Sequence, residues 1–109
     1  MSYSLRLSDR FEKEFKKLFK KYPSLKNEIS VLGQELKEDP FIGKPLGMNC
    51  YKIRLSIASK GKGKSGGARV ITFVRVVEST VYLLSIYDKS EKENISDAEI
   101  LDILNSVGE

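Results

Sequence analysis

The sequence contains no histidine, and its only cysteine is Cys50. A lone cysteine forms no internal disulfide, and without histidine it provides neither a Cys–His nucleophile pair nor a zinc site. We therefore interpret Cys50 as a packing residue. Acid–base chemistry near neutral pH must use Lys, Tyr, Asp, Glu or the substrate itself, because the side chain that normally titrates there is missing. Histidine-dependent triads and nucleases are excluded, and we predict neither a metal nor a cofactor.

Long apolar runs are also absent, since none approaches the roughly 20 residues that a membrane-spanning helix needs. Residues 1–6 lack the hydrophobic region of a signal peptide. We therefore expect a cytoplasmic protein without a membrane partner. A chain of 109 residues can bury one hydrophobic core but not two, so we predict a single domain over residues 1–109.

Acidic residues are missing from residues 40–77, a stretch that carries eight basic ones. The rest of the chain carries 11 basic and 15 acidic residues, so the formal charge is +8 inside the stretch and −4 outside it. Such a segregated charge favours a polyanion, most commonly the phosphates of a nucleic acid. The eight basic residues are Lys44, Lys52, Arg54, Lys60, Lys62, Lys64, Arg69 and Arg75.

The first half of the chain predicts a strand and two helices. Residues 3–7 alternate between apolar and polar, as in a strand, and an amphipathic helix follows between its N-cap Ser8 and Pro23. A second helix is predicted over residues 24–37, and the short turn between the helices indicates an antiparallel hairpin. Residues 39–47 hold two prolines and two glycines and are predicted to form a loop.

The second half predicts three strands and a helix. Apolar residues alternate over residues 50–58, and β-branched or apolar runs follow at residues 68–77 and 81–87. These strands pair most simply as an antiparallel meander. A capping box at residues 96–99 starts a last helix. The predicted order is β-α-α-β-β-β-α, which is an α+β fold.

Residues 58–65 satisfy a relaxed phosphate-binding-loop pattern that ends in Gly-Lys-Ser. That motif needs a helix after it, whereas a strand is predicted here, so nucleotide hydrolysis is disfavoured. We interpret the tract as a flexible cationic loop whose Lys60, Lys62 and Lys64 contact an RNA backbone. The alternative is a hairpin loop that only promotes solubility.

Three stretches resemble the RelE/ParE toxin superfamily, particularly its HigB-like branch: Tyr-Lys-Ile-Arg-Leu at 51–55, the glycine–lysine tract at 60–71, and residues 84–96. The resemblance implies a small antiparallel sheet packed on one side against the N-terminal helix hairpin. Members of the RelE and HigB branches cleave messenger RNA in the ribosomal A site and are inhibited by a cognate antitoxin. The partners implied are therefore an antitoxin, messenger RNA and the ribosome with its 16S rRNA. ParE members instead inhibit DNA gyrase.

Cleavage of RNA without a metal requires a base for the 2′-hydroxyl, stabilisation of charge at phosphorus, and a proton for the leaving oxygen. The resemblance assigns these tasks to Lys52, Arg54 and Arg69. A lysine acts as a base only if its pKa is depressed, and Arg54 is a cation that could depress the pKa of Lys52. Lys89 matches a catalytic arginine of RelE.

Ile95 falls where RelE has a tyrosine, which leaves that function open. Tyr87, Lys92 and Asn94 are candidate RNA-binding substitutes, although Tyr87 could equally be an aromatic residue at the sheet edge. The favoured function is a toxin that cleaves messenger RNA. A gyrase inhibitor of ParE type and a non-toxic relative remain as alternatives, and the isoleucine at position 95 keeps the second of these open.

Overall fold

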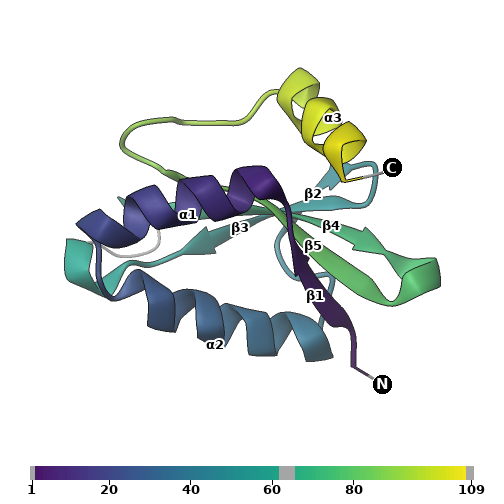
Figure 1. Ribbon diagram of the computed structural model, residues 1–109, viewed down its shortest axis with the longest axis horizontal. Coiled ribbons are helices and arrows are strands. Elements are labelled where there is room, and N and C mark those ends of the chain that lie inside the picture. Colours follow the sequence, from purple (N-terminus) through teal and green to yellow (C-terminus); the bar gives the residue numbers. More distant parts are fainter. Residues whose placement is uncertain (1, 62–65, 108–109) are drawn as a thin grey trace.

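A computed structural model describes residues 2–61 and 66–107 (Figure 1). It has the predicted α+β class, with a five-stranded mixed sheet in the order β1-β5-β4-β3-β2. Along the chain the elements are β1 (Ser4–Leu7), α1 (Asp9–Lys21), α2 (Leu25–Glu38), β2 (Lys44–Gly47), β3 (Cys50–Leu55), β4 (Ala68–Arg75), β5 (Thr80–Asp88) and α3 (Asp97–Ser106). Short 3-10 helices lie at Ala58–Lys60 and Val76–Glu78.

The helix starts follow the predicted caps. The Ser8 hydroxyl accepts a hydrogen bond from the backbone N–H of Phe11 at 3.0 Å and so caps α1. At α3 the Ser96 side chain accepts from the Glu99 N–H, while the Glu99 side chain accepts from the Ser96 N–H. This reciprocal pair is the capping box predicted from the sequence.

The strand β2 corrects the prediction of a loop over residues 39–47. It pairs antiparallel with β3 through a turn at Met48 and Asn49, whose φ angles of 55° and 60° suit a two-residue hairpin. Pro45 is tolerated because β2 is an edge strand. The four residues Lys-Pro-Leu-Gly contain two strand-disfavouring residues, which is why local propensity indicated a loop.

The strand β1 makes the sheet mixed. It pairs in parallel with β5, in the register Ser4↔Thr80 to Leu7↔Leu83. The meander of β3, β4 and β5 is antiparallel, as predicted. The local hydrophobic pattern of β1 does not show whether its partner, more than 70 residues away, runs parallel or antiparallel to it. Both strand orientations bury the same alternating side chains.

Helices cover both faces of the sheet (Figure 1). On one face α1 and α2 form a core with inward residues of the sheet, including Phe11, Leu18, Leu25, Leu32, Leu36, Ile53, Val70, Val74 and Val81. On the opposite face α3 packs over a second core, which includes Cys50, Ile71, Phe73, Leu84, Tyr87, Ile100, Ile103 and Leu104. The predicted helix hairpin therefore occupies one face, and α3 partly covers the other.

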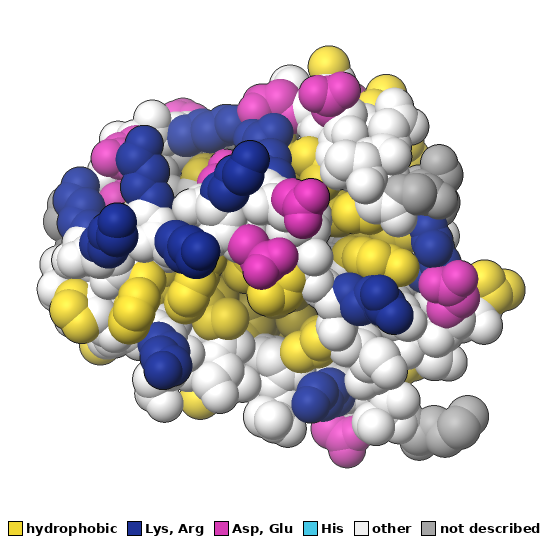
Figure 2. Space-filling view, viewed as in Figure 1, with side chains coloured by type: hydrophobic (Ala, Val, Ile, Leu, Met, Phe, Trp, Pro, Cys, Tyr) yellow, Lys and Arg dark blue, Asp and Glu magenta, His cyan; other side chains and the backbone are white. Residues whose placement is uncertain are grey.

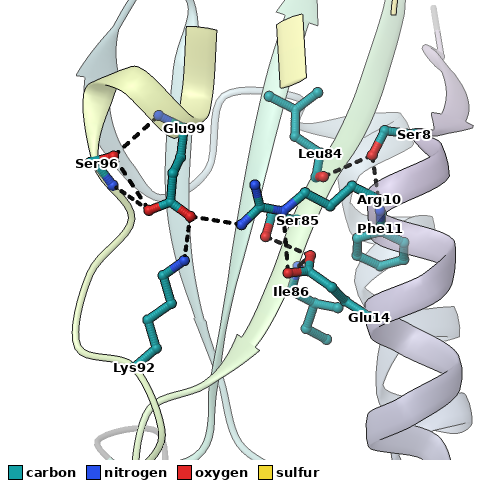
Figure 3. A network of polar contacts seen from close by, with 10 residues as sticks. All are labelled: Ser8, Arg10, Phe11, Glu14, Leu84, Ser85, Ile86, Lys92, Ser96 and Glu99. Atoms are coloured by element: carbon teal, nitrogen blue, oxygen red, sulfur yellow. Dashed lines mark hydrogen bonds and ion pairs between the residues drawn. The ribbon is translucent and has the colours of Figure 1, made fainter. Parts of the chain in front are cut away.

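A bulge in β5 sets which side chains reach each face. The pairing of β4 with β5 shifts between Ile71 and Thr72, so Leu84 is an extra residue in β5. The Glu14 carboxylate of α1 accepts hydrogen bonds from the Ser85 hydroxyl at 2.7 Å and from the Ile86 N–H at 3.2 Å (Figure 3). Glu14 therefore binds β5 where its ladder is disrupted.

The outer surface of α1 is mostly cationic. Figure 2 shows Lys and Arg side chains over α1, above a stripe of hydrophobic side chains between α1 and α2. On α1 the rings of Phe15 and Phe19 are stacked, with their centroids 5.7 Å apart. Within the described residues, none of the helices has the length and apolar character that a membrane span requires.

Candidate functional site

Three predicted catalytic residues lie on the face of the sheet that α3 partly covers. Ile53 points into the core beneath α1 and α2, so its neighbours Lys52 and Arg54 project from the opposite face. Ala68 and Val70 enter the same helix-pair core, which places Arg69 beside Arg54. The sheet register confirms this placement, since Arg54 and Arg69 are directly opposite each other.

Like charges are opposed twice in this part of the sheet. Arg54 lies opposite Arg69, and Lys44 lies opposite Lys52. Directly opposed like charges destabilise a sheet, and cross-strand pairs are worth roughly 0.2–1 kcal/mol each. Arg69 is only 4% exposed, and its Nη1 donates to the carbonyl of Ala68 at 3.1 Å. This concentration of positive charge is what a bound anion would stabilise.

A groove of about 720 Å³ opens along these residues. One wall is cationic and contains Lys44, Lys52, Arg54, Arg69 and Lys89. The groove lies where β2 ends: β2 pairs with β3 only as far as Lys52, so among the described strands none pairs with the outer edge of residues 53–55. A ligand there can therefore contact side chains from both faces of β3.

Lys52 lies among groups that lower its pKa. Its pKa is lowered first by burial, then by the positive charges of Lys44, Arg69, Arg54 and Lys89. The sequence suggested Arg54 as the cause, whereas burial is the larger effect and Lys44 comes before the two arginines. Lys52 Nζ donates a hydrogen bond to Asn94 Oδ1 at 3.1 Å.

The segment after β5 brings two more predicted residues to the groove. Lys89 and Asn94 both line it. The backbone N–H of Lys89 donates to the Gly67 carbonyl at 3.0 Å, and its Nζ lies 2.9 Å from Glu93 Oε1. Ile95 packs against the second core instead of lining the groove.

Tyr87 and Lys92 lie beside the groove and do not line it. Lys92 Nζ lies 2.6 Å from Glu99 Oε2, which also binds Arg10 Nη2 at 2.9 Å (Figure 3). These two cations, Lys92 first, hold the pKa of Glu99 at about 2. Lys92 Nζ also lies 5.6 Å from the ring centroid of Tyr87. The network joins α1, α3 and the preceding loop, which indicates a structural role for Lys92.

Tyr87 is a buried residue of the second core, 6% exposed. Burial raises the pKa of its phenol. Its hydroxyl has no hydrogen-bond partner among the described residues. The ring is therefore neither an exposed stacking platform nor an aromatic residue at an open sheet edge. It lies directly opposite Arg69 in the ladder between β4 and β5.

Lys60 has a structural role in place of the RNA contact predicted for it. Its ammonium forms an ion pair with the buried Asp88 carboxylate and donates to the Ser90 hydroxyl at 3.1 Å. The Lys60 side chain is only 8% exposed. The other two predicted loop cations, Lys62 and Lys64, lie outside the described residues.

Two basic residues had no predicted role. Lys44 joins the site because β2 places it opposite Lys52. The sequence feature that could have placed Lys44 in the site is the Met-Asn pair after Gly47, which is compatible with a two-residue hairpin turn between two strands. Arg75 instead lies over the rings of Phe73 and Tyr82, at 5.7 and 5.3 Å from their centroids.

Across residues 2–61 and 66–107, no group of three or more His, Cys, Asp or Glu side chains could hold a metal ion.

Comparisons with known proteins agree with this fold. A family model described as "RelE toxin of RelE / RelB toxin-antitoxin system" matches residues 10–107. A mutant of the E. coli toxin RelE in the free state is 25% identical, with a TM-score of 0.64, over 97% of this chain and 94% of that one.

Two solved complexes are also similar. The toxin in the intact E. coli RelBE toxin–antitoxin complex is 28% identical, with a TM-score of 0.63, over 80% of this chain and 96% of that one. The E. coli RelE mutant bound to an antitoxin RelBc peptide is 26% identical, with a TM-score of 0.64, over 94% of this chain and 93% of that one.

Proposed function

Because the chain belongs to the RelE toxin family and is a toxin component of a type II toxin–antitoxin system, we propose that it cleaves messenger RNA in the ribosomal A site. The observation that carries this proposal is the cationic wall of the groove. Two like-charge pairs meet there, and one of them contains Lys52, whose pKa is lowered. A lysine pKa that is lowered beside a groove favours a chemical role over a purely binding one, because perturbed pKa values cluster at functional sites.

The proposed reaction needs no metal. Lys52 Nζ, in its neutral form, takes the proton of the RNA 2′-hydroxyl. The 2′-oxygen forms a bond to the adjacent phosphorus while the bond from phosphorus to the 5′-oxygen breaks, giving a 2′,3′-cyclic phosphate and a 5′-hydroxyl. Arg54 and Arg69 stabilise the negative charge that develops on the phosphoryl oxygens. The Lys89 ammonium supplies the proton that the leaving oxygen takes.

The partners follow from this function. RelE is solved in complex with its antitoxin, which supports an antitoxin as the partner that inhibits this chain. Messenger RNA and the ribosome, including 16S rRNA, are the proposed targets, and they place the protein in the cytoplasm. The groove residues Asn94 and Lys89 support a HigB-like variant of the site, since both lie in the segment that resembles that branch.

The test is to induce the chain in bacteria, record growth, and map the 5′ ends of messenger RNA. We expect growth arrest and new 5′ ends, both lost in Arg69→Ala and Arg54→Gln. Arg6→Gln is the control matched to Arg54→Gln, because Arg6, like Arg54, is an exposed strand arginine but lies on β1 at the far edge of the sheet. Arrest without new RNA ends would favour a gyrase inhibitor, and no arrest would favour a non-toxic relative.

A further inference from the structure

Among the described residues, Lys52 is the groove lysine that is partly buried and has no acidic partner. Its Nζ donates to the amide oxygen of Asn94, a hydrogen bond that a neutral amine can also make. Lys89 lines the same groove but forms an ion pair with Glu93, and Lys44 is exposed on the edge strand β2. Because no carboxylate holds the Lys52 amine in its protonated form, this amine is the one best placed to act as a nucleophile.

The residues around Lys52 increase its reactivity. Arg54 lies two residues further along the same face of β3, and Lys44 lies opposite Lys52 in the ladder with β2. Arg54 in turn lies opposite Arg69. Burial first, and then these neighbouring cations, lower the pKa of Lys52, which favours the neutral amine.

The same cations make the groove a binding site for small anions. A cleft lined by charges of one sign raises the local concentration of ions of the other sign, and guanidinium groups bind phosphate well. Arg54 is exposed in the groove, and its side chain leaves β3 on the same face as that of Lys52. A phosphate bound by Arg54 therefore lies beside the Lys52 amine. A ligand with an electrophilic carbon next to its phosphate would present that carbon to the amine.

We propose that Lys52 is a site of covalent modification by acyl phosphates, small molecules in which a carboxylic acid is joined to phosphate. The phosphate lies at Arg54 and Arg69, and Lys52 Nζ attacks the carbonyl carbon. The bond from that carbon to the bridging oxygen breaks, phosphate leaves with the bonding electrons, and the nitrogen releases a proton to solvent. The products are an amide at Lys52 and inorganic phosphate, so the step is redox-neutral.

The modification would switch off RNA cleavage, a consequence that rests on the proposed function. An amide nitrogen is not basic and cannot take the proton of the 2′-hydroxyl, and the cationic wall loses one charge. The modification itself does not require the protein to cleave RNA. The chemistry at Lys52 and its effect on activity can therefore be measured separately.

The first measurement follows the reaction of the purified, folded protein with acetyl phosphate, using mass spectrometry to quantify acetylation at each lysine. We expect Lys52 to react at least about tenfold faster than Lys26, because cationic clefts concentrate anions by that factor or more. Lys26 is the reference, since it is exposed on α2 and does not line the groove. Inorganic phosphate should slow the reaction at Lys52 but not at Lys26. Similar rates at the two lysines, or no effect of inorganic phosphate at Lys52, would overturn the proposal.

A neutral donor separates phosphate binding from the reactivity of the amine. Acetic anhydride carries no phosphate, so Arg54→Gln should slow its reaction with Lys52 only through the lost charge. With acetyl phosphate the same variant should slow Lys52 about tenfold more, the effect expected of one hydrogen bond to a charged group. The control Arg6→Gln should leave both rates unchanged, since Arg6 lies on the opposite edge strand β1. Equal slowing with the two donors would overturn the phosphate site.

The second measurement compares acetylation with the cleavage of messenger RNA on purified ribosomes. Cleavage should fall in step with acetylation at Lys52 and not with acetylation at Lys26. Protein that is acetylated rapidly at Lys52 but never cleaves RNA would support the modification site and overturn the proposed function. Cleavage that persists when Lys52 is fully acetylated would overturn the switch.

Discussion

The buried ion pair between Asp88 and Lys60 should make the free energy of unfolding depend on pH in the acidic range. The Asp88 side chain has no exposed surface, and its carboxylate accepts hydrogen bonds from Lys60, from Ser90, and from the Tyr22 hydroxyl at 3.1 Å. Burial by itself would raise the pKa of this carboxyl. The three donors outweigh burial and lower the pKa from 3.8 to about 2.

The lowered pKa converts into a free energy of unfolding. One pKa unit corresponds to about 1.4 kcal/mol, so the fall in the Asp88 pKa corresponds to about 2 kcal/mol. Because the folded pKa lies below the unfolded one, this contribution is complete above the unfolded value of 3.8. It is lost as the pH falls through the folded value of about 2.

The perturbation is Asp88→Asn, measured by urea unfolding at a series of pH values from 7 to 2. At pH 7 we expect the variant to lose about 3–5 kcal/mol, because the buried Lys60 ammonium loses its charged partner. Between pH 5 and pH 2 its stability should change by about 2 kcal/mol less than that of wild type. With the usual slope for small proteins, this is a difference of about 1–2 M urea in the midpoint.

Two further variants keep the measurement decisive. Glu91→Gln removes an exposed carboxylate of the neighbouring segment and should retain the pH dependence of wild type. The double variant Lys60→Met with Asp88→Asn removes both buried charges, so we expect it to recover much of the loss seen in Asp88→Asn. Parallel pH curves for wild type and Asp88→Asn would refute the reasoning.

Two more predictions concern the cationic wall. Arg54→Gln removes one of two opposed arginines, so the thermal midpoint should rise by about 1–4 °C while RNA cleavage falls; calorimetry that shows a lower midpoint would contradict the inferred repulsion. Lys44→Gln removes the cation that ranks first among the charges lowering the Lys52 pKa, so that pKa should move up towards its ordinary value. An NMR pH titration of isotopically methylated lysines measures this shift, which should be absent in the control Lys26→Gln.

Much of the fold could be predicted because its signals are local. The Ser8 cap, the capping box at Ser96, and the helical and strand periods each depend on neighbouring residues, and the structure reproduces them. The resemblance to RelE toxins used short motifs in a fixed order, and the family match confirms it. The sequence did not predict the parallel pairing of β1, because its partner β5 is distant along the chain. It did not predict β2 either, because that strand is defined by its pairing with β3 across a tight turn.

For the candidate site, the sequence predicted which types of residue take part but not which acidic residues the cations pair with. A stretch without acidic residues identified the cations, and strand alternation placed Lys52 and Arg54 on one face. The sequence could not show that Lys60 pairs with Asp88, or that Lys92 pairs with Glu99, because both acidic partners lie outside the stretch and approach only on folding.

The sequence by itself determined the segregation of charge, the absence of histidine chemistry, and the identity of the elements, because composition and short-range periodicity are properties of the chain. Only the tertiary structure decided which of the eight cations act together. Lys44, Lys52, Arg54 and Arg69 meet because β2, β3 and β4 align in register, and Lys60 leaves the group because a buried carboxylate stabilises it elsewhere. The number of charged residues can be read from the sequence, but which charged residues lie next to each other depends on how the strands pair.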